Sequence, residues 1–202
     1  MIAQAMWAEP SFKGKAVTNP DELYEASALI LWGGEDIATS FYNEAPVYSF
    51  SNYQPSRRDL IERNLVNRAK ELKIPILGVC RGAQLLCALD GGKLWQHVDN
   101  HAGFDHEVEL YDGRVIQTNS LHHQMMRPRD GNDLLGWSVP RSPIKFDQNG
   151  EHNDVKPEPE VVHFVDMMAL GVQGHPEYTS KSAVKLREFT KELFFNLFKV
   201  EL

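Results

Sequence analysis

The sequence has little cysteine, and this scarcity limits what its cysteines can do. Only two of the 202 residues are cysteines, Cys80 and Cys87, seven positions apart. If both lie on or beside one helix, a rise of roughly 1.5 Å per residue separates them by about 10 Å, which is too far for a disulfide. We therefore expect two free thiols in a reducing compartment, where a thiol is available for chemistry.

The chain also lacks basic runs and long apolar segments. Its formal net charge is −7, whereas nucleic-acid binders usually carry a basic stripe. No apolar run reaches the length of a membrane span, and the first residues lack the basic and apolar regions of a signal peptide. We expect a cytoplasmic protein whose partners include neither nucleic acid nor membrane.

Short apolar runs alternate with amphipathic stretches, which predicts an α/β protein with a mostly parallel sheet. The length fits a single domain over residues 1–202, large enough to bury a core. The expected strands lie at 28–32, 76–79 and 168–173, and the expected helices at 59–72, 81–89 and 180–199.

The middle of the chain predicts antiparallel pairing instead. Asp112-Gly113 lies between two alternating segments and is a hairpin signal. The strands expected in this region cover residues 106–110, 115–118, 134–139 and 160–165. The polar segment 140–159 contains four prolines, and we expect it to be a long loop.

The amino-terminal segment is short for this kind of fold. Residues 2–7 and 15–17 could form strands, but only residues 8–14 connect them, whereas a parallel crossover needs about a dozen residues. We expect the first helix to be missing or reduced to a turn. A second copy of the chain could cover the exposed flank of the sheet, which makes a homodimer one hypothesis.

Cys80 lies where a predicted buried strand meets a predicted helix. Gly78 and Gly82 flank it at two positions on either side, and small residues there allow a sharp turn that presents a nucleophile. The helix N-terminus favours a thiolate, and the Arg81 amide would face an oxyanion. A free cysteine is often only a small buried side chain, and we interpret Cys87 in that way.

A cysteine nucleophile needs a base, and the base needs a partner that holds its tautomer. His175-Pro176-Glu177 follows another predicted buried strand. The proline forces a turn, so the carboxylate of Glu177 can accept a hydrogen bond from the imidazole. On its own this triplet is weak evidence for a catalytic base. Its position after a predicted strand, and after the Cys80 turn in the sequence, makes that interpretation stronger.

Two motifs together, Gly-Val-Cys-Arg-Gly-Ala-Gln and the distal Gly-Val-Gln-Gly-His-Pro-Glu, resemble the class I glutamine amidotransferase superfamily. The resemblance implies a flavodoxin-like three-layer sandwich that uses no cofactor. It also implies that Cys80 is the nucleophile, His175 the base and Glu177 the group that orients it.

Other segments resemble one branch of that superfamily, the γ-glutamyl-γ-aminobutyrate hydrolases of the peptidase C26 type. They follow the branch's order from about residue 18 to 180 and include Gly33-Gly34-Glu35-Asp36-Ile37 and Asn119-Ser120-Leu121-His122-His123-Gln124. The resemblance implies that the Gly34 amide completes the oxyanion hole with Arg81. It implies substrate contacts for Gly33, Gln84, Ser120, His122 and His123.

Two residues depart from the branch. Trp32 replaces an expected proline, and Gly174 stands where the branch usually has a bulky aromatic residue. We expect Gly174 to widen the pocket beside His175, so the identity of the substrate stays open.

The implied reaction is cysteine-dependent hydrolysis of a small γ-glutamyl amide, either glutamine or a γ-glutamyl amine, through a γ-glutamyl thioester. One alternative is a glutaminase subunit that delivers ammonia to a separate synthase or amide ligase, because the sequence contains no synthase domain. A silent binding module is a third hypothesis, which an intact triad disfavours.

Histidines are plentiful in the middle of the chain but show no tight metal-ligand spacing. We therefore expect no metal, and a loop without any ligand is the alternative for the pair His122-His123. The histidines considered are His97, His101, His106, His122 and His123.

Overall fold

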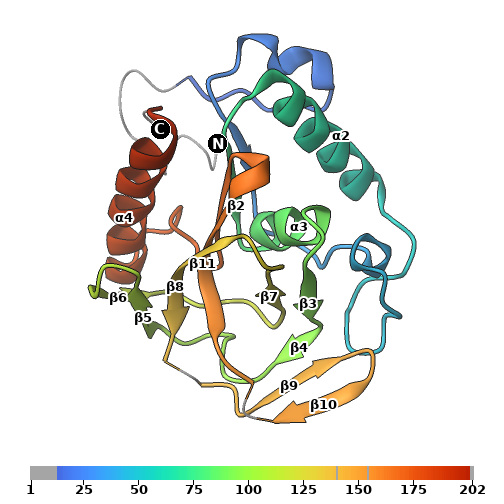
Figure 1. Ribbon diagram of the computed structural model, residues 1–202, viewed down its shortest axis with the longest axis vertical. Helices are drawn as coiled ribbons and strands as arrows, with labels where there is room; N and C mark the ends of the chain where they lie inside the picture. The colour runs from blue at the N-terminus through green and yellow to red at the C-terminus, as the bar shows by residue number, and fades with distance from the viewer. Residues whose placement is uncertain (1–12, 140, 154, 201–202) are drawn as a thin grey trace.

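The computed structural model describes residues 13–139, 141–153 and 155–200. They form three layers, with a central sheet between two layers of helices (Figure 1). The strands of that sheet are β1 (Leu29–Leu31), β2 (Ile76–Val79), β5 (His106–Leu110), β6 (Val115–Thr118), β8 (Asp133–Ser138), β11 (Glu158–Phe164) and β12 (Ala169–Val172). The long helices are α2 (Arg57–Leu72), α3 (Arg81–Leu89) and α4 (Lys181–Phe198). Helices α2 and α3 cover one face and α4 covers the other, so the predicted α/β sandwich is confirmed.

The sheet is parallel where its strands come from the two ends of the chain and antiparallel where they come from the middle. Its strand order is β1-β2-β12-β11-β8-β5-β6. Strands β1, β2 and β12 are parallel to one another, while every pairing from β12 through β11, β8 and β5 to β6 is antiparallel. The predicted β5–β6 hairpin is present. Because the carboxyl ends of β1, β2 and β12 meet at one edge, residues that follow these strands are brought together.

Strand β2 shows why its sequence is apolar throughout. Ile76 packs with α2 and α3 on one face, whereas Leu77 and Val79 pack with α4 on the other. A strand that is covered on both faces has no solvent side, so the alternation of polar and apolar residues disappears. Full burial of each such side chain contributes about 1.5–3 kcal/mol.

Smaller elements surround this frame. They are the 3-10 helices η1 (Pro20–Glu25), η2 (Thr39–Tyr42) and η3 (Val165–Met167) and the strands β3 (Lys93–Trp95), β4 (His97–Val98), β7 (Met125–Arg127), β9 (Ile144–Asp147) and β10 (Gly150–Asn153). Strand β3 pairs with β7, and β9 pairs with both β4 and β10.

The long loop predicted at 140–159 is wrong over most of its length. Strands β9 and β10 form a hairpin there, and β11 already begins at Glu158. The hairpin turns through Gln148 and Asn149. Gly150 follows as the first residue of β10, and its φ of 110° is a conformation that glycine adopts readily. Its strands belong to a small separate sheet and are partly exposed, so they carry the polar residues that made the segment look like a loop.

The predicted strand at 15–17 is also wrong. Residues 13–16 are exposed and form no strand. Within the described part of the chain, β1 pairs only with β2, so no strand from this segment extends the sheet beyond β1. The predicted strand at 2–7 and most of the short connection at 8–14 lie outside the described residues. Leu23 of η1 is buried in the core beside α2 and covers this end of the sheet.

Within the described ranges, none of the helices combines the length and the apolar character that crossing a membrane requires.

Candidate active site

Cys80 occupies a strained turn between β2 and α3. Its φ and ψ of 51° and −110° lie outside the regions that side-chain-bearing residues favour. Its N–H donates to the carbonyl oxygen of Val172 at 2.7 Å, and a side chain at Gly82 would overlap the Leu31 carbonyl. Strain of this kind costs on the order of 1–3 kcal/mol and is concentrated at functional sites.

His175 follows β12 and therefore lies at the same sheet edge as Cys80. Its Nδ1 is 2.7 Å from Glu177 Oε1, and the Tyr178 ring stacks on it at 4.8 Å. Burial lowers the pKa of His175, but the hydrogen bonds and charges of Cys80 and Glu177 outweigh burial and raise that pKa to about 10. The arrangement therefore favours an imidazolium between a sulfur and a carboxylate.

Asn119 holds the backbone of His175 from the opposite side. Its Oδ1 accepts from the His175 N–H at 2.6 Å, and its Nδ2 donates to the His175 carbonyl oxygen at 2.8 Å. Both bonds are buried, so the side-chain amide fixes the peptide from which the imidazole extends. The sequence places Asn119 in the motif that ends at Gln124 but does not reveal its role, because its partner His175 lies 56 residues away.

Replacing Asn119 by alanine is expected to lower kcat by about 10²-fold, because misplacing a reacting group by about 1 Å typically has that effect. KM should change little, since Asn119 does not line the pocket described below. Steady-state kinetics of amide hydrolysis measure both quantities. Asn100→Ala is the matched control, because Asn100 only donates to the exposed Arg141 carbonyl. A rise in KM at unchanged kcat would contradict the positioning role.

The Gly33-Gly34 segment follows β1 and borders the same pair of residues. A Cβ added at Gly33 would lie 2.9 Å from His175 Cε1 and 3.5 Å from Cys80 Cβ. Arg58 of α2 secures this segment from behind, since its Nη2 donates to the carbonyl oxygens of Trp32 at 2.8 Å and Gly33 at 3.1 Å. The structure thus places Gly33 against Cys80 and His175, with no room for a side chain.

Four charged side chains connect this segment to the first turn of α3. The buried Arg81 guanidinium pairs with Asp59 at 2.5 Å and with Glu62, and Glu62 pairs with Arg58 at 2.7 Å. A side chain at Gly34 would overlap the Arg58 guanidinium. This network holds the backbone at Gly34 and at Arg81, the two positions from which the resemblance implied oxyanion donors. The sequence does not indicate the network, although three of its members share one face of α2.

A pocket of about 670 Å³ opens beside Gly34 and Arg81. His123 lines it, as the resemblance implied, and its Nε2 lies 2.8 Å from Asp36 Oδ1. The Phe50 ring stacks on His123 at 4.3 Å and is 83% exposed. The remaining lining residues are Glu35, Ser51, Asn52, Gln54, Ser56 and Arg58.

The other three residues expected to contact substrate point into the protein. Gln84 donates to the Gln124 carbonyl at 3.2 Å, and Ser120 donates to the carbonyl oxygen of His101. His122 is 3% exposed, and its Nδ1 lies 2.8 Å from the Gln124 carbonyl oxygen. The structure therefore brings none of these three side chains to the lining of the pocket.

The expectation that Gly174 widens the pocket is wrong. A Cβ at Gly174 would lie 2.6 Å from a Leu186 methyl and 2.9 Å from the Asn119 carbonyl oxygen. Glycine allows α4 and the Asn119 segment to approach the backbone closely, so the missing side chain leaves no additional space for substrate.

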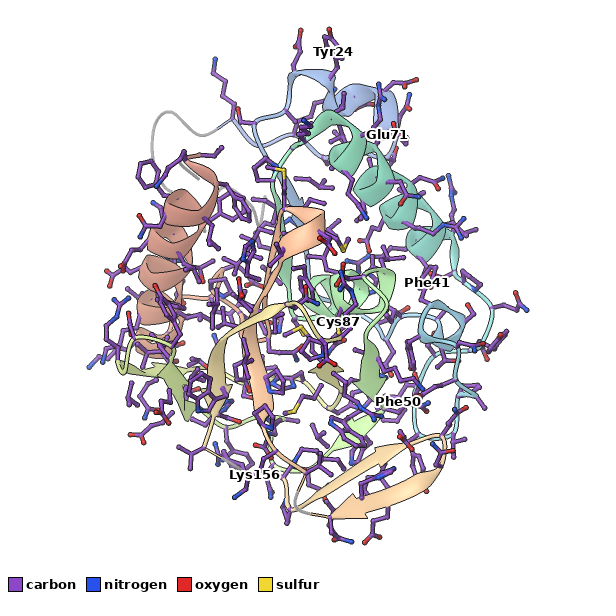
Figure 2. The ribbon with its side chains drawn as sticks, viewed as in Figure 1. Tyr24, Phe41, Phe50, Glu71, Cys87 and Lys156 are labelled. Carbon is purple, nitrogen blue, oxygen red and sulfur yellow. The ribbon has the colours of Figure 1, made fainter. Side chains whose placement is uncertain are left out.

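Both cysteines are free, as predicted. Cys87 lies inside the molecule on α3 (Figure 2). Burial raises the pKa of its thiol to about 12, so Cys87 stays protonated and unreactive at neutral pH.

Near the Asn119 segment, the structure brings together two histidines that show no tight metal-ligand spacing in the sequence and one glutamate. His101, His122 and Glu160 each present one ligating atom within 4.8 Å of the others, and all three are buried. Two ion pairs extend the group, because His101 is 3.1 Å from Glu158 and Glu158 is 2.8 Å from Lys145. Burial raises the pKa of Glu158, but hydrogen bonds from His101, Lys145 and the Arg141 N–H outweigh burial and lower that pKa to about 2.

The amino-acid sequence of the chain is similar to those of known proteins. The peptidase C26 family pattern matches residues 20–177. NtpR of Enterococcus hirae is 30% identical over 178 residues, which are 76% of this chain and 68% of NtpR. The γ-glutamyl-CDP-amidate hydrolase of Campylobacter jejuni is 36% identical over 108 residues, 54% of this chain and 48% of the hydrolase. The carbamoyl phosphate synthase small chain of Streptococcus pyogenes is 32% identical over 63% of this chain and 32% of its own length.

Solved structures agree on the fold. A glutamine amidotransferase crystal structure superposes with a TM-score of 0.61 over 98% of this chain and 93% of its own, at 14% identity. A second glutamine amidotransferase, from Thermotoga maritima, gives 0.54 over 93% of this chain and 71% of its own, at 19% identity. Because the family pattern covers most of the chain and NtpR is matched over two thirds of its length, the chain belongs to the peptidase C26 family of glutamine amidotransferase-like proteins.

Proposed function

We propose that the chain hydrolyses a γ-glutamyl amide through a γ-glutamyl thioester on Cys80, with His175 as base and Glu177 as the group that orients it. The observation that carries the proposal is the His175 ring, which lies 2.7 Å from Glu177 and borders Gly33 together with Cys80 in one buried site. Family membership supports amide hydrolysis as the type of reaction.

The raised pKa of His175 favours an imidazolium beside Cys80 at neutral pH, and in the proposed reaction this imidazolium carries the proton that the Cys80 thiol gives up. The thiolate attacks the γ-carbonyl carbon, and the C–N bond breaks as His175 donates its proton to the departing nitrogen. Free amine or ammonia leaves. His175 then takes a proton from water, whose oxygen attacks the thioester carbonyl. Glutamate departs and the Cys80 thiolate returns.

The oxyanion of each tetrahedral intermediate would be stabilised by the backbone amides of Arg81 and Gly34. Arg81 is the first residue of α3, so its N–H is among those that the helix leaves unpaired. Gly34 lies across the site on the segment that Arg58 secures. Loss of one such donor typically costs about 10²–10³ in kcat.

The pocket beside Gly34 and Arg81, whose lining includes neither Cys80 nor His175, offers room for a leaving group larger than ammonia. Its volume of about 670 Å³ lies within the range of sites for small organic ligands. The lining includes the carboxylates of Glu35 and Asp36 and the guanidinium of Arg58. The Campylobacter jejuni relative is by name a hydrolase of a γ-glutamyl-CDP-amidate, which is consistent with a bulky polar leaving group here.

A second candidate is a glutaminase subunit that passes ammonia to a separate synthase or amide ligase. The similarity to the carbamoyl phosphate synthase small chain supports it. In that case the chain alone would turn glutamine over slowly, and a partner would accelerate it. A homodimer stays a separate hypothesis on which neither reaction depends.

Amine and ammonia release by the purified chain tests the proposal. We expect turnover of at least one γ-glutamyl amine from a panel that includes glutamine, and a loss of roughly 10⁴-fold or more in Cys80→Ala. Cys87→Ala is the matched control and should retain activity, since Cys87 is buried away from the pocket. Equal losses in both variants would contradict the nucleophile assignment. A folded chain without turnover on any substrate would favour the partner-dependent glutaminase.

A further inference from the structure

We propose that His101, His122 and Glu160 form a buried zinc site, separate from the candidate active site. The three ligating atoms would be His101 Nδ1, His122 Nε2 and a carboxylate oxygen of Glu160. They come from the loop after β4, the segment before β7 and strand β11, so only the folded chain brings them together.

Two of the three separations between these atoms suit a tetrahedral ion, and all three atoms lie within 4.8 Å of one another. His101 Nδ1 lies 3.4 Å from Glu160 Oε1, and His122 Nε2 lies 3.5 Å from the same oxygen. Bonds of about 2.0–2.1 Å from nitrogen and oxygen to a tetrahedral Zn²⁺ place neighbouring ligand atoms roughly 3.3–3.4 Å apart. The observed spacing is too long for a good hydrogen bond and close to that of ligands sharing one ion.

Each histidine is held from behind by an oxygen atom. Nε2 of His101 is 3.1 Å from Glu158 Oε2, and Nδ1 of His122 is 2.8 Å from the Gln124 carbonyl oxygen. Both oxygens are acceptors, so these two nitrogens would keep their protons when zinc binds. Zinc would then bind the opposite nitrogens, and any proton on them would be released. A carboxylate or carbonyl behind a ligating histidine is the usual support of a zinc ligand.

The two imidazole nitrogens and one oxygen of Glu160 have no hydrogen bond among the described residues. These atoms are His101 Nδ1, His122 Nε2 and Glu160 Oε2, and the three residues are 0%, 3% and 2% exposed. The other oxygen of Glu160, Oε1, is the one that His106 Nε2 approaches at 3.0 Å. Buried polar atoms are normally paired, and a group of them converging on one point is typical of a site for an ion or a water. Two imidazoles and a carboxylate form a donor set that suits zinc.

His106 completes the surroundings. Its Nε2 lies 3.0 Å from Glu160 Oε1, so it can donate to the ligating carboxylate or supply a fourth ligand. The site lies behind the segment 119–124, and Asn119 at the start of that segment clamps His175. A bound ion would tie this segment to β11 and stiffen the support of the candidate base.

The test is zinc binding by the full chain in a Cys80→Ala background, which removes the candidate active-site thiol as a competing ligand. After treatment with a chelator and its removal, the chain is dialysed against ZnCl₂ and its metal content is measured. We expect one zinc per chain, and a higher melting temperature with zinc than without. Co²⁺ in place of Zn²⁺ should give the visible absorption of a tetrahedral site without a thiolate band.

Variants locate the ion. His122→Gln and Glu160→Gln should each weaken zinc binding by more than the roughly 10–100-fold that loss of a supporting outer contact costs. His163→Gln, on the same strand as Glu160 but paired with Asp133 at its own site, should bind zinc like the parent. The proposal is overturned if the parent binds no zinc, or if the folded His122 and Glu160 variants bind it as tightly as the parent. Should those variants fail to fold, an absent or octahedral Co²⁺ spectrum in the parent overturns it.

Discussion

Replacing Glu177 by glutamine is expected to lower kcat by roughly 10³–10⁴-fold while the fold stays intact, which is the usual result of neutralising the acid of a nucleophile–histidine–acid triad. Glu177 Oε1 lies 2.7 Å from His175 Nδ1, and its carboxylate can only accept a hydrogen bond from that nitrogen. A glutamine amide can also donate, which permits the wrong imidazole tautomer. It also removes the negative charge that stabilises the imidazolium.

A histidine titration separates this electrostatic role from a structural one. In the wild type the pKa of His175 is raised to about 10, in part by Glu177, so its ring signal in NMR should stay in the imidazolium form through neutral pH. In Glu177→Gln the same signal should titrate at a lower pH. Glu188→Gln, an exposed change on α4, should leave both kcat and the titration unchanged. An unshifted His175 titration in Glu177→Gln would contradict the proposed role.

The raised pKa of His175 also makes the stability of the folded protein depend on pH. Because the pKa of His175 rises from 6.5 to about 10 on folding, its charged form stabilises the folded state fully below about pH 6.5. That contribution is lost as the pH rises through about 10. The difference in unfolding free energy between wild type and Glu177→Gln should therefore shrink above pH 10, which urea unfolding at several pH values measures.

What the sequence predicted well was local in the chain. The glycine-flanked Cys80 follows four consecutive buried residues of β2, and the short turn that carries His175 and Glu177 follows β12. Burial on both faces of the sheet and the turn chemistry of glycine and proline leave signatures within a few residues. These positions could be assigned without knowing which strands are neighbours.

What the sequence could not predict depends on contacts between distant segments. Asn119 reaches His175 across 56 residues, and Glu160 approaches His122 only because β11 lies in the middle of the sheet. The β9–β10 hairpin was missed for a related reason. Its strands pair outside the main sheet and are not buried on both faces, so their sequence resembles that of a loop.

The largest loss of stability is expected from Arg81→Met. The Arg81 side chain is 2% exposed, and the Asp59 side chain that it contacts at 2.5 Å is 1% exposed. Asp59 keeps its cap bonds from Ser56 after the change, but its Oδ1 loses the buried cation. Removing one partner of a buried ion pair typically costs about 3–5 kcal/mol, a large fraction of the roughly 5–15 kcal/mol that stabilises a domain.

Urea unfolding of three variants separates the buried charge from simple loss of packing. Arg68→Met removes an exposed pair with Glu71 and should cost only about 0–1 kcal/mol. Combining Arg81→Met with Asp59→Asn removes the stranded charge, so the double variant should recover part of the loss. If the double variant loses the sum of the two single losses, the pairing is not what stabilises this contact. In that case the effect of Arg81 comes from the packing of its side chain between α2 and α3.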